Sequence, residues 1–84
     1  MYPLKYYLHK RMINDTYNKA IIEINNSDLC MLDGIYNYYN FEFQSIANHL
    51  KYTNGGTKRD ELLNLIKNNR KEIKRMILIR RGVL

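Results

Sequence analysis

The chain has 84 residues and a net charge of +6, which leaves room for one domain with one small core. Hydrophobic residues make up 45% of it and charged residues 26%, as in globular proteins, so intrinsic disorder is not expected. The sequence has no signal-peptide pattern, no apolar run near membrane-spanning length, and a single cysteine. We therefore expect one helical domain over residues 1–84 in a reducing, cytoplasmic compartment, without membrane contact.

The charge is unevenly distributed along the chain. Residues 1–24 carry four basic and two acidic side chains, and residues 25–50 carry three acids and neither Lys nor Arg. Residues 51–84 carry ten basic and three acidic side chains. Because a clustered positive field attracts polyanions, we expect a negatively charged partner to contact this last segment.

The first predicted helix covers residues 4–24, just after Pro3. Its apolar residues recur with a seven-residue spacing and fall within a narrow arc at about 100° per residue. They are Tyr6, Ile13, Tyr17, Ala20 and Ile24. The alternative for the end of this segment is a short strand at AIIEI, because that stretch is rich in β-branched residues.

Two further helices are predicted in the middle of the chain. The segment NNSD breaks the first pattern, and Ser27 or Asp28 can cap a helix over residues 28–39. The expected core face of this helix comprises Leu29, Leu32, Ile35, Tyr36 and Tyr39. A third helix is predicted from Asn40 to Tyr52, with core residues at the spacing i, i+3, i+4 and i+7. These core residues are Phe43, Ile46, Ala47 and Leu50. The sequence TNGG that follows is a strong turn signal.

A basic C-terminal helix is predicted over residues 57–81. Thr57 opens a segment that resembles a capping box, with Asp60 in place of the usual Glu. The expected core seam comprises Leu62, Ile66, Asn69, Ile73 and Met76. Residues 76–84 open with the apolar run MILI, which fits either a buried helix end or a short closing strand. The predicted fold is therefore all-α, a small bundle of about four helices.

Basic side chains gather along one side of this last helix. Five of them fall within an arc of about 100°, beside the apolar seam. They are Lys67, Arg70, Lys71, Lys74 and Arg81. We expect these five and Arg80 to contact phosphate groups of a nucleic acid. A solvated helix face and a contact with an acidic protein surface are the alternatives.

Residues 42–69 resemble a helix-turn-helix hairpin. The pattern FxxIAxxL over residues 43–50 is similar to the first helix of that motif, with Ala47 where the two helices approach closely. In this interpretation the start of the next helix reads base edges, and duplex DNA is expected before RNA. The residues assigned to this readout are Thr57, Lys58, Arg59 and Asn64. Transcription regulation is the activity that such a motif implies.

Two aromatic residues, Tyr38 and Phe41, are expected to point outward near the acidic middle of the chain. Exposed aromatics away from cations are typical of a protein interface, here either a homodimer contact or a docking site for another protein. The alternative function is a non-enzymatic effector of phage or mobile-element type. Such an effector inhibits a host nucleic-acid machine, for example a CRISPR nuclease.

No catalytic, metal or cofactor site is predicted. The sequence lacks a glycine-rich phosphate-binding pattern, and its two histidines and one cysteine have no metal-ligand spacing. His9 and His49 are expected to be half-exposed helix residues, and Cys30 a small core or edge residue. We therefore expect neither enzyme activity nor a bound cofactor.

Overall fold

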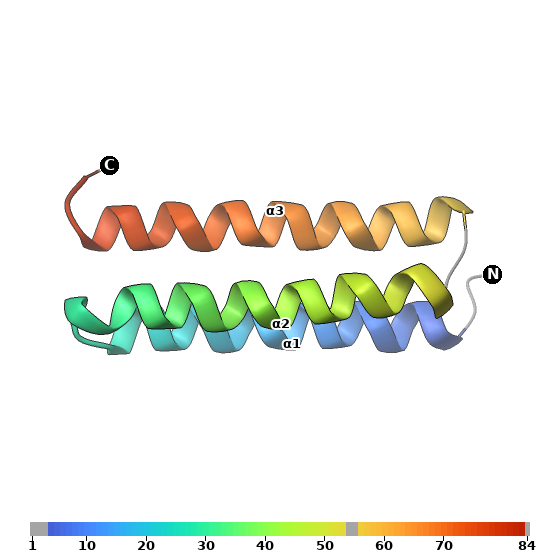
Figure 1. Cartoon of the computed structure of the whole chain (residues 1–84), viewed down its shortest axis with the longest axis horizontal. Coiled ribbons are helices and arrows are strands. Elements are labelled where there is room, and N and C mark those ends of the chain that lie inside the picture. The colour runs from blue at the N-terminus through green and yellow to red at the C-terminus, as the bar shows by residue number, and fades with distance from the viewer. Residues whose placement is uncertain (1–3, 54–55, 84) are drawn as a thin grey trace.

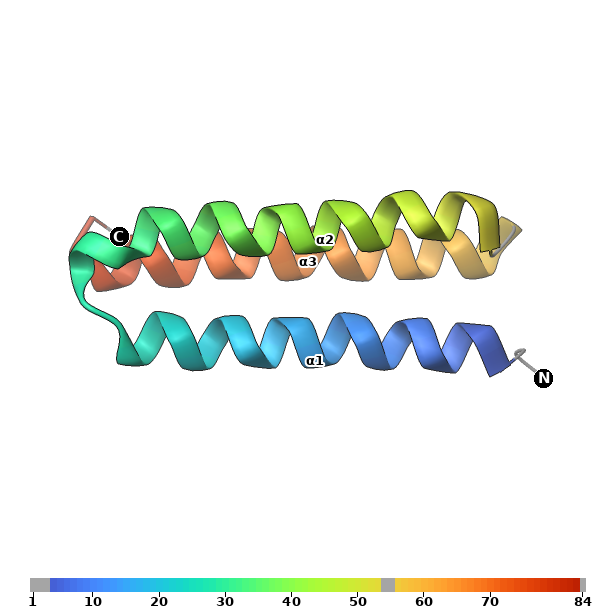
Figure 2. The same cartoon turned by 60° about the horizontal axis from the view of Figure 1, so that its bottom comes forward.

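The computed structural model describes residues 4–53 and 56–83, which form three α-helices and one short 3-10 helix. The elements are α1 (Leu4–Asn26), η1 (Leu29–Met31), α2 (Leu32–Thr53) and α3 (Gly56–Arg80). Figures 1 and 2 show the α-helices side by side in up-down-up order along the long axis of the molecule. The principal extents are 43 × 19 × 18 Å. The all-α prediction is confirmed.

The described part of the chain has three α-helices instead of the predicted four, because one helix occupies the segment assigned to two. α2 continues through Asn40 without a break. Asn costs a helix less than about 1 kcal/mol relative to Ala, and the buried positions continue across it from Tyr39 to Phe43. The expected start of a helix at Asp28 is instead the 3-10 turn η1, where Leu29, predicted to be in the core, is exposed.

The helix-turn-helix hairpin predicted over residues 42–69 is not confirmed. The helices of that motif cross at about 90–120°. Here α2 and α3 lie alongside each other over most of their lengths (Figures 1 and 2). The contacts are spread almost evenly over the three helix pairs, so α3 is a full member of the bundle.

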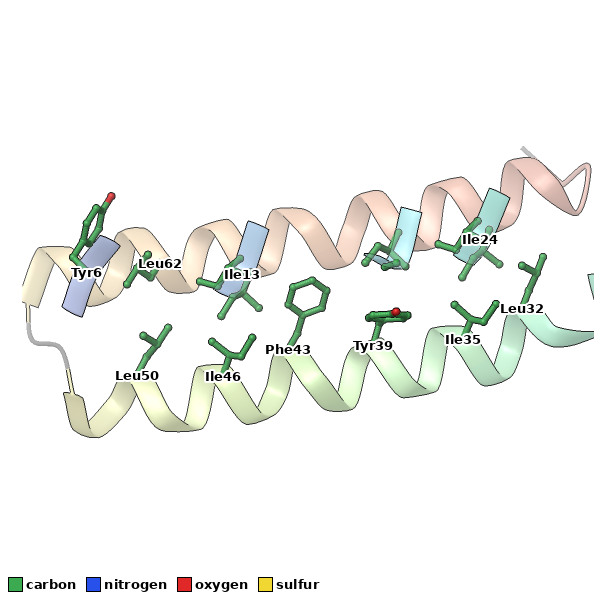
Figure 3. Close-up of a cluster of buried hydrophobic side chains, with 14 residues drawn as sticks. Tyr6, Ile13, Ile24, Leu32, Ile35, Tyr39, Phe43, Ile46, Leu50 and Leu62 are labelled. Atoms are coloured by element: carbon green, nitrogen blue, oxygen red, sulfur yellow. The ribbon is translucent and has the colours of Figure 1, made fainter. Parts of the chain in front are cut away.

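The core follows a seven-residue spacing in each helix. Leu32, Ile35, Tyr39, Phe43, Ile46 and Leu50 are buried along α2. They meet Tyr6, Ile13, Ala20 and Ile24 of α1 and Leu62, Ile66, Ile73 and Ile77 of α3. Figure 3 shows Phe43 and Tyr39 pointing from α2 into the space between the other two helices. Spacing of this kind packs neighbouring helices at a shallow angle, which explains the side-by-side arrangement.

Two polar side chains, His9 and Asn69, also lie in the core. The prediction that His9 is half-exposed is wrong, since only 7% of it is exposed. It follows Tyr6 by three residues and precedes Ile13 by four, which places it on the buried face of α1. The Nδ2 atom of Asn69, a predicted core residue, has no hydrogen-bond partner among the described residues.

α3 covers nearly the predicted range of residues 57–81, but its start differs from prediction. The helix begins at Gly56, with a φ of 58°, so Thr57 lies inside the helix and is not its N-cap. Residues 54–55 of the predicted turn lie outside the described residues. At the other end α3 continues to Arg80, so the run MILI belongs to the end of a helix, and the closing strand considered for residues 76–84 is not formed over the described residues 76–83.

Gly82 ends the last helix. Its φ of 74° suits glycine, and its N–H donates to the Ile79 carbonyl at 3.0 Å. The N–H of Val83 donates to the Leu78 carbonyl, also at 3.0 Å. These two bonds form a Schellman motif, which satisfies carbonyls that a helix end otherwise leaves without partners.

Candidate nucleic-acid interface

A groove runs between α2 and α3, and its larger cavity has a volume of about 370 Å³. The side chains that line it are Tyr36 and Ala47 from α2, and Leu63, Ile66, Lys67, Arg70, Lys71 and Lys74 from α3. No α1 residue is among them, so the groove lies on the outer side of the α2–α3 pair. Its floor is apolar and its rim is basic.

A smaller cavity of about 150 Å³ adjoins the first, because Tyr36 and Lys74 line both. The remaining lining residues of the smaller cavity are Asp33, Ile77, Leu78 and Arg81. We call the two cavities together the α2–α3 groove. Five of the six residues predicted to contact phosphate line it, so the structure brings this part of the predicted site together.

Three lysines at the rim have no partner in the described part of the chain. Lys67, Lys71 and Lys74 are exposed, and none of them makes a hydrogen bond or an ion pair with another described residue. Each is a strongly hydrated point charge on a flexible stem. Their charges are therefore free to contact an anion without breaking an internal bond.

The two arginines at the groove are held by α2. The Nε–H of Arg70 donates to Asn40 Oδ1 at 3.0 Å, and its Nη1 donates to Gln44 Oε1 at 3.4 Å. Arg81 forms an ion pair with Asp33, the acid in the groove lining. The roles of Asn40 and Gln44 could not be predicted from their spacing, because they depend on how α2 and α3 face each other.

Arg80 lies away from the groove. Its Nη1 donates to the carbonyl oxygens of Ile24 and Ser27, the latter at 2.7 Å. These carbonyls are at the end of α1 and in the segment before η1, where the helix leaves acceptors without partners. The structure thus places this predicted phosphate ligand in a contact that ties α3 to α1.

The four residues predicted to read bases are at the start of α3, outside the groove lining. Thr57 and Asn64 are exposed, and Lys58 and Arg59 are half-buried. At about 100° per residue, Arg59 falls on the same flank of α3 as Leu63 and Arg70, and Lys58 falls on the opposite flank. The set is therefore divided over different sides of the helix.

The predicted interface aromatics, Tyr38 and Phe41, are exposed on α2, 55% and 68% respectively. The Tyr38 ring packs edge-on against that of Tyr39 at a centroid distance of 4.9 Å. Neither residue lines the α2–α3 groove. The exposure expected from the sequence is thus present, on a different surface from the basic rim.

Tyr36, which was predicted to lie on the core face of its helix, is the aromatic residue in the lining of the α2–α3 groove. It is half-buried at the edge of the core and lines both cavities of the groove. The position of Tyr36 in the sequence could have indicated its place at the groove. It follows the buried Leu32 by four residues and precedes Asn40 by four, which places it at the edge of the apolar face of α2.

Two titratable groups in the core, His9 and Tyr39, have shifted pKa values. Burial lowers the pKa of His9, and nearby His49 and Lys5 lower it further. The two imidazole rings pack edge-on with centroids 5.2 Å apart. Burial, followed by a hydrogen bond to Glu23, raises the pKa of Tyr39 to about 12. Over residues 4–53 and 56–83, no group of three or more His, Cys, Asp or Glu side chains is arranged to hold a metal ion.

Comparisons with protein families, curated proteins and solved structures gave no match to this chain. Within the described residues, none of the helices combines the length and the apolar character that crossing a membrane requires.

The side chain of Cys30, which was expected at the core or its edge, is exposed.

Proposed function

We propose that the protein is a non-enzymatic nucleic-acid-binding protein that contacts sugar-phosphate backbone through the α2–α3 groove. The observation that carries this proposal is the set of three lysines, Lys67, Lys71 and Lys74, without a partner among the described residues. They project from about two turns of one helix. A closely spaced row of cations gains free energy on binding phosphates, because each contact releases condensed counterions.

The arrangement of the helices favours backbone contact over base reading through a recognition helix. A helix-turn-helix protein presents the start of its second helix to the major groove of duplex DNA. In this bundle α3 packs along α1 and α2, and the residues predicted to read bases lie outside the groove. Contacts of the phosphate type fix position and carry no direct sequence information, so we expect little sequence preference.

Fluorescence anisotropy tests this proposal. Labelled single-stranded DNA, duplex DNA and RNA are titrated with protein at about 50 and 200 mM salt. We expect binding that weakens with salt and is lost in the variant K67E/K71E/K74E. The matched control K5E/K10E/K19E makes the same change in net charge on exposed positions of α1 and should keep more of the affinity.

The second candidate function is a protein-binding effector that inhibits a host nucleic-acid machine. Its support is the exposure of Tyr38 and Phe41, since exposed aromatics are frequent at the centres of protein interfaces. The same titration separates the two candidates. Absence of binding to all three probes at low salt contradicts the nucleic-acid proposal and leaves the protein-binding one.

A further inference from the structure

We propose that the α2–α3 groove takes unpaired bases of a single-stranded nucleic acid, with Tyr36 as the stacking residue. This inference rests on the proposed function and specifies its substrate class. Proteins that bind single strands combine a positively charged groove with aromatic side chains on which bases stack. The α2–α3 groove has both parts in one place.

The first step is the position of Tyr36 among the cations. Tyr36 and Lys74 line both cavities, and Lys67, Arg70 and Lys71 line the larger one with them. A strand whose phosphates follow the lysines therefore brings its bases close to the aromatic ring. Tyr38 and Phe41, although more exposed, line neither cavity.

The second step is the apolar floor. Leu78 is half-buried and Ile77 is buried, and both line the smaller cavity together with Tyr36. Ala47, Leu63 and Ile66 continue the apolar lining along the larger cavity. The outer surface of a duplex presents charged phosphates and sugars, which gain nothing from such a floor. An unpaired base has two flat apolar faces and gains free energy when one of them leaves water.

The third step is the placement of Arg70 on the α2 side of the groove. Asn40 and Gln44 accept two of its N–H donors and fix the guanidinium group. A guanidinium group has five N–H donors, so three remain for a phosphate or a base edge. The groove thus has three flexible lysines and one oriented arginine with free donors, while its fifth cation, Arg81, is paired with Asp33.

An acidic amphipathic helix is the competing occupant, and the geometry favours it less. A helix that binds in a groove needs a row of open apolar pockets for anchors at i, i+3 or i+4, and i+7. In this groove the aliphatic floor residues are buried or half-buried against the core, so they leave no row of open pockets for such anchors. Tyr36 is the aromatic residue in the lining. One aromatic surface beside several cations suits a base and its phosphate.

The test compares three probes of equal length at low salt, measured by fluorescence anisotropy. They are an oligo(dT) strand, the same strand with abasic sites in place of the bases, and a duplex. We expect the wild-type protein to bind oligo(dT) more tightly than the other two. Equal affinity for oligo(dT) and the abasic strand overturns the inference, while salt-dependent binding to both keeps the proposed function. Absence of binding to every probe overturns both this inference and the proposed function.

Variants at one position identify the stacking residue. Y36L keeps apolar bulk and should lower the affinity for oligo(dT) roughly 5- to 150-fold, with little change for the abasic strand. Y36F keeps the ring and should bind as the wild type does, and Y38L is the control outside the groove. An equal loss for both strands in Y36L, with helicity retained by circular dichroism, overturns the assignment. Displacement of oligo(dT) by an acidic helical peptide that binds more tightly than any of the strands also overturns it.

Discussion

The basic side chains near the C-terminus divide into two groups according to what their charged ends contact. Arg75 pairs with Glu72 on the same helix, and this contact holds the pKa of the carboxyl below its usual range. Arg80 binds backbone carbonyls, and Arg81 pairs with Asp33. The lysines at the groove have no such contacts within the described residues. At the scale of single residues, Arg75, Arg80 and Arg81 therefore make internal contacts, and the groove lysines Lys67, Lys71 and Lys74 remain available to a ligand.

Titration of His9 should make the stability of the fold depend on pH. Its pKa is lowered in the folded protein, chiefly by burial, so the unfolded chain binds the proton more readily. The contribution of neutral His9 to the free energy of unfolding is then fully present above the ordinary pKa of about 6.5. This contribution is lost as the pH falls through the lower pKa of the folded protein. Urea unfolding at about pH 7.5 and pH 5.5 should show this decrease, and H9L should show a smaller one. The same decrease in H9L and wild type contradicts the assignment to His9.

At the scale of the helices, the predicted faces are confirmed and some predicted boundaries are wrong. The buried sides of α1 and α3 follow from spacing, because a seven-residue repeat fixes which side of a helix is apolar. Single positions differ, since Tyr17 and Met76 are only half-buried and His9 and Ile77 are buried. The break at Asn40 is wrong because a weak helix former does not end a helix whose apolar face continues. The contacts of Arg80 were not predictable, since its acceptors lie 53 and 56 residues away in the chain.

Replacing Arg80 should weaken the fold and leave nucleic-acid binding nearly unchanged. R80M keeps much of the apolar stem but removes the donors to the Ile24 and Ser27 carbonyls. Hydrogen bonds from a charged group contribute about 1.5–3 kcal/mol, so we expect a loss of that order in the free energy of unfolding. The control R75M removes an exposed ion pair and should cost less than about 1 kcal/mol. Unchanged urea unfolding of R80M, with weakened nucleic-acid binding, places Arg80 in the interface and contradicts its structural role.

At the scale of the whole molecule, the candidate site arises from the way two helices face each other. The basic stripe on α3 was predictable from residue spacing. Its partner surface on α2, with Tyr36, Asn40 and Gln44, was not, because periodicity does not specify which flanks of two helices meet. The acidic and basic segments of the chain are therefore less separate in space than in sequence, since Asp33 and Arg81 form an ion pair across the groove.

An NMR titration of the ¹⁵N-labelled protein with unlabelled oligo(dT), observed through the backbone amides, locates the binding surface directly. We expect shift changes to concentrate at the α2–α3 groove, around Tyr36, Leu63, Arg70 and Lys74. We expect none along the exposed apolar row Leu4, Leu8 and Met12 of α1. Changes that concentrate on α1 or around Phe41, or a spectrum that oligo(dT) leaves unaltered, contradict the assignment of the groove as the functional site.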